Sequence, residues 1–130
     1  MSDVAATAVI LIAHGSRRAE ANDDVRAIAQ ELESRGEYAM VDVAYLELAE
    51  PSIPAAAQTC VARGAKRVLL MPYFLSAGRH VVEDLQRHCC ELSEAHPHVA
   101  IELCPPLGVH PLMLDIICDR LRERLNDESR

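Results

Sequence analysis

The sequence is poor in aromatic side chains and contains no tryptophan. Half of its 130 residues are hydrophobic, yet the only aromatic ones are Tyr38, Tyr45, Tyr73 and Phe74. A chain of this length can bury one core, and that core must be aliphatic. So few rings argue against a stacking surface for single-stranded nucleic acid. They also argue against an electron-transfer module that sandwiches a flavin between aromatic rings.

The sequence also lacks an excess of basic residues. It has 13 Lys and Arg against 20 Asp and Glu, which gives a formal net charge of -7. A surface of this sign repels a phosphate backbone unless its basic residues gather in one patch. Neither a phosphate-binding loop nor a dinucleotide-binding fingerprint is visible. We therefore expect no nucleic-acid partner and no nucleotide hydrolysis.

Signals for export, membrane insertion and disulfide pairing are missing as well. The apolar run at residues 8–13 is preceded by no positive charge, is followed by no small-residue cleavage site, and is too short to span a bilayer. The number of cysteines is odd and no C-x-x-C pair occurs, which indicates reduced side chains that fill the core. They are Cys60, Cys89, Cys90, Cys104 and Cys118. We expect a cytoplasmic protein that contacts no membrane.

Apolar runs of strand length alternate with stretches of helical period. The runs lie at residues 8–13, 40–46, 67–73 and 99–103. This alternation is typical of successive β-α units around a parallel sheet. The first run is apolar throughout, as in a central strand that is buried on both faces. The sequence therefore predicts a single α/β domain over residues 1–130, with its core at about 8–125. Its three layers consist of helices that flank a four-stranded parallel sheet.

A helix is expected after each strand. The inner stripe of the first helix should consist of Val25, Ile28, Ala29 and Leu32. Ser16 lies where its side chain would cap the start of that helix. The last helix follows a Pro-Pro-Leu-Gly segment, and it is expected to bury Met113, Ile116, Ile117 and Leu121.

Two of the six histidines occupy equivalent places in the predicted fold. His14 directly follows the first strand, and His80 lies a few residues after the third. In open parallel sheets ligands bind beyond the carboxyl ends of the strands, so both histidines should face one crevice. Taken separately, His14 is equally well interpreted as a loop histidine bound to a backbone carbonyl. His80 is equally well interpreted as part of a helix N-terminus.

A pair of imidazoles suits a divalent metal of borderline softness. Neutral imidazole binds such metals, and it also accepts a proton near pH 7. Two histidines are too few for a closed structural zinc site, which normally has four ligands. Water or a substrate must then fill the remaining positions. The pattern therefore favours an open site that delivers or inserts a metal.

Charged residues follow the strands near the same predicted edge. The carboxylates are Glu47, Glu50 and Asp84, and the arginines are Arg17, Arg18 and Arg79. Arginines and helix N-termini hold anionic ligands through charge-assisted hydrogen bonds, which favours a substrate with several carboxylates. A scatter of solvated surface arginines explains the basic residues equally well, and carboxylates in such places are more often solvated residues or caps. His110, which precedes Pro111, is interpreted as a helix-start residue.

Four short blocks carry a resemblance to a known family. They are residues 13–17 (AHGSR), 45–52 (YLELAEPS), 78–84 (GRHVVED) and 105–111 (PPLGVHP). In their order and spacing, the chain from about residue 8 to residue 122 resembles the CbiX-type sirohydrochlorin chelatases. The resemblance implies a class II chelatase fold and ATP-independent insertion of cobalt, or else of iron or nickel, into sirohydrochlorin. The pathway would be that of cobalamin or siroheme. The metal is then a substrate, and no cofactor is permanently bound.

The resemblance also assigns residues. The family's two active-site histidines match His14 and His80, as catalytic groups and metal ligands, and which of them binds the metal and which accepts protons stays open. Candidates for binding the macrocycle are Ser16, Arg17, Glu47, Ser76, Ala77, Gly78 and Arg79. Long family members carry two such modules, whereas this chain has one, so a homodimer is expected. The alternative is a non-catalytic carrier of metal or tetrapyrrole with the same fold, and the retention of both histidines argues against it.

Overall fold

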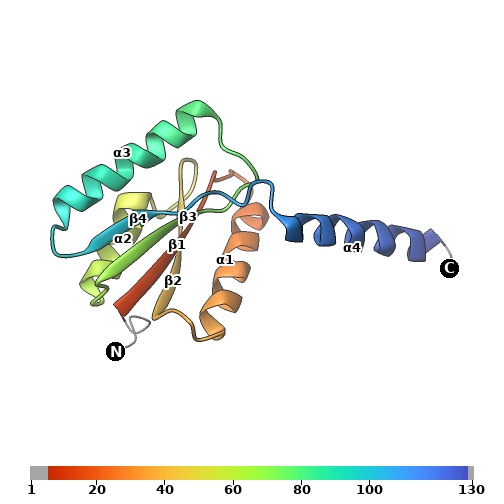
Figure 1. The fold of residues 1–130 in the computed structure, drawn as a ribbon, viewed down its shortest axis with the longest axis horizontal. Helices are drawn as coiled ribbons and strands as arrows, with labels where there is room; N and C mark the ends of the chain where they lie inside the picture. The colour runs from red at the N-terminus through yellow and green to blue at the C-terminus, as the bar shows by residue number, and fades with distance from the viewer. Residues whose placement is uncertain (1–5, 129–130) are drawn as a thin grey trace.

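The computed structural model describes residues 6–128, and strands and helices alternate along the chain as the sequence predicts (Figure 1). The strands are β1 (Thr7–Ala13), β2 (Met40–Tyr45), β3 (Arg67–Pro72) and β4 (Ala100–Leu103). The helices are α1 (Ala19–Ser34), α2 (Ile53–Ala62), α3 (Arg79–Ala95) and α4 (Pro111–Glu128). The four strands form one parallel sheet in the order β2-β1-β3-β4. The predicted fold class is confirmed.

Strand β1 is central and buried on both faces, which explains its uninterrupted apolar sequence. Ala8, Ile10 and Ile12 have no exposed surface on one face, and Val9 and Leu11 are 5% and 4% exposed on the other. Burial of one such large aliphatic side chain contributes about 1.5–3 kcal/mol. The core therefore lies around β1, and the chain that follows β1 starts from a rigid support.

The two faces of the sheet are covered to different extents. Helices α2 and α3 cover one face, where Ile53, Cys60, Leu85 and Leu92 pack in a single buried cluster with the strands. Helix α1 covers the other face, and it lies over β2 and β1. On this face of β3, Leu69 and Met71 are only partly buried and Arg67 is exposed. This face is therefore closed over two strands and more open over the other two.

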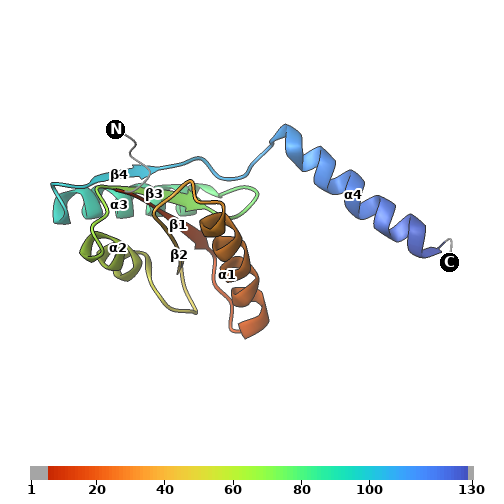
Figure 2. The same ribbon diagram turned by 90° about the horizontal axis from the view of Figure 1, so that it is seen from below.

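Helix α4 departs from the sequence-based prediction. It leaves the domain as an arm, and the two perpendicular views agree on this (Figures 1 and 2). Ile116, Ile117 and Leu121 are 50%, 52% and 58% exposed, and Met113 is partly exposed. The prediction that the helix buries these residues within the domain is wrong. Periodicity identifies an apolar face on a helix, but it does not say which surface that face packs against.

The start of α1 also differs from the expectation. The helix begins at Ala19 after Arg18, whose side chain makes no capping hydrogen bond. Ser16 therefore does not cap α1, and its hydroxyl instead accepts a hydrogen bond from the Arg18 amide at 3.0 Å. Along the helix Val25 and Ala29 are buried as expected, whereas Ile28 is 45% exposed.

The five cysteines are free, but they do not all fill the core. Cys60 is buried and Cys89 and Cys104 are partly buried, as expected, while Cys90 and Cys118 are exposed on α3 and α4. The prediction was therefore wrong for the last two. Within residues 6–128, none of the helices combines the length and apolar character that a membrane crossing requires.

Candidate functional site

The structure brings His14 and His80 to one cavity at the carboxyl edge of the sheet. His14 follows β1 directly, and His80 is the second residue of α3. A cavity of about 440 Å³ is lined by both histidines together with Glu47 and Asp84. The apolar part of its lining comes from Leu46 and Val81. Two histidines and two acidic residues thus line the same space.

Backbone hydrogen bonds hold His14 in place. The Leu46 amide donates to the Ala13 carbonyl at 3.0 Å, and the Glu47 amide donates to the His14 carbonyl at 3.1 Å. The pairing of β1 with β2 therefore continues past the end of both strands. Its effect is to fix the backbone of His14 and Glu47 relative to each other.

Gly15 permits the close approach of these two segments. Its φ is +94°, and a Cβ built on it would lie 1.7 Å from the Glu47 carbonyl oxygen. Any side chain at this position would therefore collide with backbone, and the positive φ would strain it further. The glycine in the Ala-His-Gly-Ser block is thus required by local geometry.

The imidazole of His14 lies on the ring of Phe74, with 4.5 Å between ring centroids. Phe74 follows β3 and packs against the buried cluster on the α2 and α3 face. The Tyr73 amide donates to the Ile12 carbonyl at 2.7 Å, which anchors this loop to β1. Sequence reasoning did not assign Phe74 to the site. The available signal was that the only phenylalanine in the sequence comes directly after the apolar run at residues 67–73.

His80 and Asp84 lie one turn apart at the start of α3. The helix is preceded by Gly78, whose carbonyl accepts from the Val82 amide at 3.0 Å. Asp84 accepts a hydrogen bond from the Arg87 guanidinium, and its other oxygen lies 3.9 Å from Nε2 of His88. Asp84 therefore connects the cavity to the charged side chains further along the helix.

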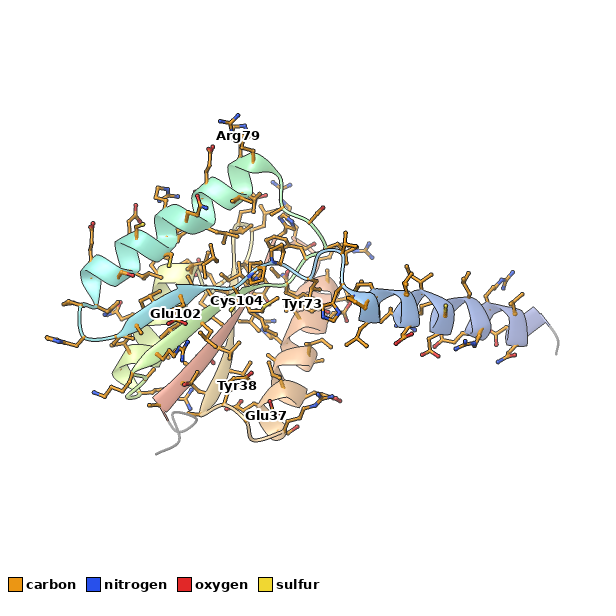
Figure 3. All side chains as sticks on the ribbon, in the orientation of Figure 1. Glu37, Tyr38, Tyr73, Arg79, Glu102 and Cys104 are labelled. Atoms are coloured by element: carbon orange, nitrogen blue, oxygen red, sulfur yellow. The ribbon has the colours of Figure 1, made fainter. Side chains whose placement is uncertain are left out.

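The other predicted substrate residues lie around the cavity and do not line it. The Arg79 side chain is 89% exposed and pairs with Glu83 on the outside of α3 (Figure 3). Arg17 is exposed. Ser16 is tied to Asn22, which accepts from the Ser16 amide and donates to its carbonyl.

The loop between β3 and α3 is placed in a comparable way. Ser76 and Gly78 are exposed at the rim, and Ala77 lines a neighbouring hollow beside Cys104 and Pro105. Glu50 is exposed, and its carbonyl accepts from Arg26 at 3.4 Å. In the described residues 6–128, no group of three or more His, Cys, Asp or Glu side chains is arranged to hold a metal ion.

The segment after β4 is attached to the same loop. The Leu107 amide donates to the Phe74 carbonyl at 3.2 Å, and the Gly108 amide donates to the Leu75 carbonyl at 2.6 Å. His110 then accepts a hydrogen bond from the Leu112 amide on its Nδ1 at 3.1 Å, at the beginning of α4. The interpretation of His110 as a helix-start residue is confirmed.

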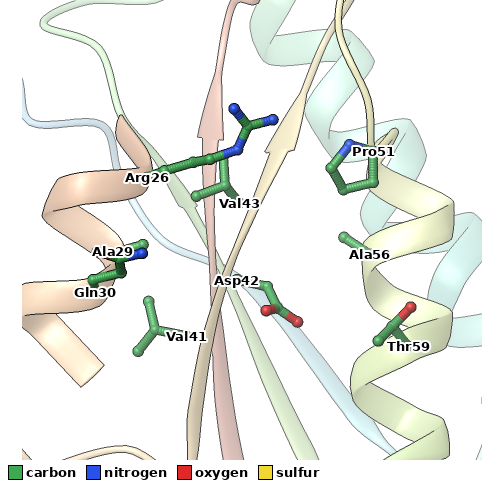
Figure 4. Close-up of a pocket in the computed structure, with 9 residues that line it drawn as sticks. All are labelled: Arg26, Ala29, Gln30, Val41, Asp42, Val43, Pro51, Ala56 and Thr59. Atoms are coloured by element: carbon green, nitrogen blue, oxygen red, sulfur yellow. The ribbon is translucent and has the colours of Figure 1, made fainter. Parts of the chain in front are cut away.

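A separate hollow of about 320 Å³ lies along the edge strand β2, between α1 and α2 (Figure 4). Its polar lining consists of Arg26, Gln30, Asp42 and Thr59. It contains neither histidine, and it lies beside the strands instead of beyond their carboxyl ends. Of the residues that sequence reasoning selected for the site, His14, His80, Glu47 and Asp84 line the histidine cavity, and none lines this hollow.

Fold and site together define a class: a parallel α/β domain with two histidines on an open cavity beyond the ends of its strands. A family model described as CbiX matches residues 8–124. The chain belongs to this family.

Known proteins of the family are similar along nearly the whole chain. A chloroplastic sirohydrochlorin ferrochelatase of Arabidopsis thaliana is 36% identical over 121 residues, which cover 93% of this chain and 54% of the relative. A sirohydrochlorin cobaltochelatase of Methanopyrus kandleri is 27% identical, with 93% and 99% covered. The chain spans about half the length of the first of these and nearly all of the second.

Solved structures show the same fold. A putative cobalamin biosynthesis CbiX protein from Marinobacter aquaeolei superposes with a TM-score of 0.81 at 30% identity, covering 93% of this chain and 98% of that one. The sirohydrochlorin chelatase SirB from Bacillus subtilis, in complex with cobalt, gives a TM-score of 0.82 at 22% identity. That match covers 90% of this chain and 50% of the SirB chain. At this identity the second likeness concerns the fold alone.

Proposed function

We propose that this protein inserts a divalent metal ion into sirohydrochlorin without using ATP. The observation that carries the proposal is the cavity that His14 and His80 share with Glu47 and Asp84. Membership of the CbiX family and the names of the relatives, ferrochelatase and cobaltochelatase, supply the substrate class. Cobalt, iron and nickel are the candidate metals, because all three accept imidazole and oxygen ligands. Cobalt is the favoured one of the three.

The proposed chemistry exchanges two protons for one metal ion. A free macrocycle holds two pyrrole N–H protons, and these must leave while the hydrated metal sheds water. His14 and His80 are near enough to share one cavity, so together they supply a neutral metal ligand and a proton acceptor. The carboxylates of Glu47 and Asp84 offer further oxygen ligands or proton acceptors at the same cavity. Positioning of both reactants beside these groups lowers the barrier.

The rim of the cavity suits an anionic macrocycle. Arg17 is exposed near His14 and Arg79 is exposed beside His80, so both guanidinium groups are free to turn toward peripheral carboxylates of the substrate. Arg79 would exchange its Glu83 partner for that carboxylate. The Ser76–Gly78 loop and the start of α3 add backbone N–H groups at the positive end of the helix dipole.

We further propose that the working form is a homodimer. Some relatives, such as the Arabidopsis ferrochelatase, are about twice as long as the part that this chain matches. Two copies of this chain would supply a comparable amount of structure. The family resemblance points to the same assembly.

The experiment mixes purified protein with sirohydrochlorin and Co²⁺, Fe²⁺ or Ni²⁺, without ATP, and follows the absorption change on insertion. We expect a rate above the spontaneous one, and a loss of about 100-fold or more in His14→Ala and His80→Ala. His98→Ala is the matched control, because His98 is exposed in the turn before β4, at the opposite edge of the sheet. A wild-type rate equal to that of buffer would sink the enzyme proposal and leave a carrier, which equilibrium binding of Co²⁺ and macrocycle would then reveal.

A further inference from the structure

Two leucine side chains are exposed in the loops beside the histidine cavity. Leu48, after β2, is 53% exposed, and Leu75, after β3, is 57% exposed. Each directly follows a residue that contacts His14, since the Glu47 amide binds the His14 carbonyl and the Phe74 ring lies on the imidazole. Strands β2 and β3 are the two neighbours of β1 in the sheet (Figure 1). The loops that carry the two leucines therefore flank His14 on opposite sides.

The backbone at Leu48 is strained. Its φ is +66°, and within residues 6–128 it is the one residue other than glycine with a positive φ. A leucine adopts this conformation at a cost, whereas glycine and asparagine adopt it readily. Strained residues of this kind cluster at ligand sites. Neither the backbone conformation nor the exposure to water favours a leucine at this position in the free protein.

The backbone at Leu75 is held by the segment after β4. Its carbonyl accepts from the Gly108 amide at 2.6 Å, and the carbonyl of Phe74 accepts from the Leu107 amide at 3.2 Å. The Leu75 side chain is nevertheless exposed. Both leucines therefore extend from a fixed backbone. The apolar surface that they offer is pre-organised, which reduces the entropy lost when a ligand covers it.

The substrate of the proposed function has an apolar body and a charged rim. A tetrapyrrole macrocycle is flat and conjugated, and sirohydrochlorin carries carboxylates around its edge. Glu47 and Asp84 line the cavity, so their negative charges would repel those carboxylates from its centre. The body of the ring must therefore occupy the cavity while its carboxylates stay outside, where Arg17 and Arg79 are exposed.

Aromatic side chains do not supply the contacts for the body of the ring. Tyr45 is 2% exposed, and Phe74 is in contact with the imidazole of His14. Tyr38 precedes β2 and therefore lies toward the opposite edge of the sheet, and Tyr73 packs with the buried cluster on the α1 face. Contacts with the apolar surface of the macrocycle thus fall to aliphatic side chains.

We propose that Leu48 and Leu75 bind the macrocycle by packing against its apolar surface and hold it over His14. This inference rests on the proposed function and adds two substrate-binding residues to it. The leucines supply affinity without direction, whereas the arginines at the rim bind carboxylates. Because the two leucines flank His14, contact with both keeps the centre of the ring beside the imidazole. The pyrrole protons and the metal are exchanged at that centre.

The test measures equilibrium binding of metal-free sirohydrochlorin to the full chain by its absorption change, without any metal. Covering the exposed half of one leucine should strengthen binding by about 3- to 10-fold. We therefore expect the Kd to rise by about that factor in Leu48→Asn and in Leu75→Asn. The double variant should combine both losses, since the two residues lie in separate loops.

Two control variants accompany these. Leu48→Met keeps an apolar side chain and should bind sirohydrochlorin like the wild type. Ile28→Asn removes a side chain that is 45% exposed on α1 and does not line the cavity, so its Kd should be unchanged. A loss of binding in Ile28→Asn equal to that in Leu48→Asn would overturn the inference.

Two further measurements separate a substrate contact from a structural role. Asparagine accepts a positive φ, so Leu48→Asn should unfold in urea at the same midpoint as the wild type or a higher one. A leucine that merely held the loop would give a lower midpoint. In insertion assays KM should rise while kcat stays the same, because the contact is equal in the ground state and the transition state. The loss of affinity should also be equal at low and high salt, whereas a loss that acts through charge would shrink.

Failure of this inference and failure of the proposed function give different results. A wild type that binds sirohydrochlorin, with both leucine variants binding it equally well, would overturn the inference alone. A wild type that binds no sirohydrochlorin would overturn both. Sedimentation of the same variants tests a different occupant: a changed molar mass with an unchanged Kd for sirohydrochlorin would show that the leucines contact another copy of the chain, and it would overturn the inference.

Discussion

The imidazole of His14 and the ring of Phe74 lie in contact, inclined by 32° with their centroids 4.5 Å apart. The two residues come from neighbouring strands, since His14 follows β1 and Phe74 comes two residues after β3. Phe74 packs against the buried core cluster, and His14 lines the cavity. The ring is therefore a support that limits the orientations of the histidine.

We predict that loss of this support lowers turnover. An aromatic pair contributes about 0.5–1.5 kcal/mol, so Phe74→Leu should reduce kcat by about 2- to 10-fold. KM should change little, because Phe74 acts through His14 and is a positioning residue. Phe74→Tyr keeps the ring and is the control. Insertion kinetics with both variants check this, and an unchanged kcat in Phe74→Leu would show that His14 needs no ring beneath it.

Gly15 gives a second prediction, on stability. In Gly15→Ala the positive φ alone costs about 1–3 kcal/mol of folding free energy. The new Cβ also collides with the Glu47 carbonyl oxygen, which adds to that cost. Gly64→Ala is the control, because Gly64 has a φ of +100° but open space around it. Urea unfolding should show a larger loss for Gly15→Ala than for Gly64→Ala. Equal losses would mean that the loop yields without cost.

Cys60 gives a prediction about reactivity. The pKa of the Cys60 thiol is raised from 9.0 to about 12. Burial is the larger cause, and the hydrogen bond that the thiol donates to Asp42 at 3.3 Å is the next. The thiolate is the reactive form, so Cys60 should resist a thiol reagent at pH 8 while the exposed Cys90 and Cys118 react. Mass spectrometry of the modified peptides measures the order, and early labelling of Cys60 in folded protein would contradict it.

The same shift fixes the sign of a pH effect. A thiol whose pKa is higher in the folded state than in the unfolded state stabilises the fold in its protonated form. That contribution is complete below pH 9 and is lost as the pH rises from 9 toward 12. The free energy of unfolding should therefore fall over this range. The fall should be smaller in Cys60→Ala than in the wild type.

Much of the fold could be predicted from the sequence because it follows from local pattern. The uninterrupted apolar run of β1 indicated a central strand, and parallel topology then placed the ends of β1 and β3 at one edge. From this, His14 and His80 were expected in one crevice, and they line one cavity. Their chemical roles remain a proposal.

Other features depend on the path of loops, which periodicity does not encode. The contact of Phe74 with His14 requires the particular turn after β3, and Arg79 pairs with Glu83 one turn along its helix. The apolar residues of α4 were correctly placed on a helix but wrongly expected inside the domain. A sequence pattern shows that a face is apolar, and it leaves open which surface that face contacts.

Backbone hydrogen bonds hold the loop between β3 and α3 in place at the rim of the cavity. Its first residue, Tyr73, is bound by β1, its middle by Leu107 and Gly108, and its last, Gly78, by the first turn of α3. Swinging this loop aside as a lid would break bonds to three separate elements at once. We therefore expect the macrocycle to enter and leave an already open crevice, so that turnover runs without a gating step.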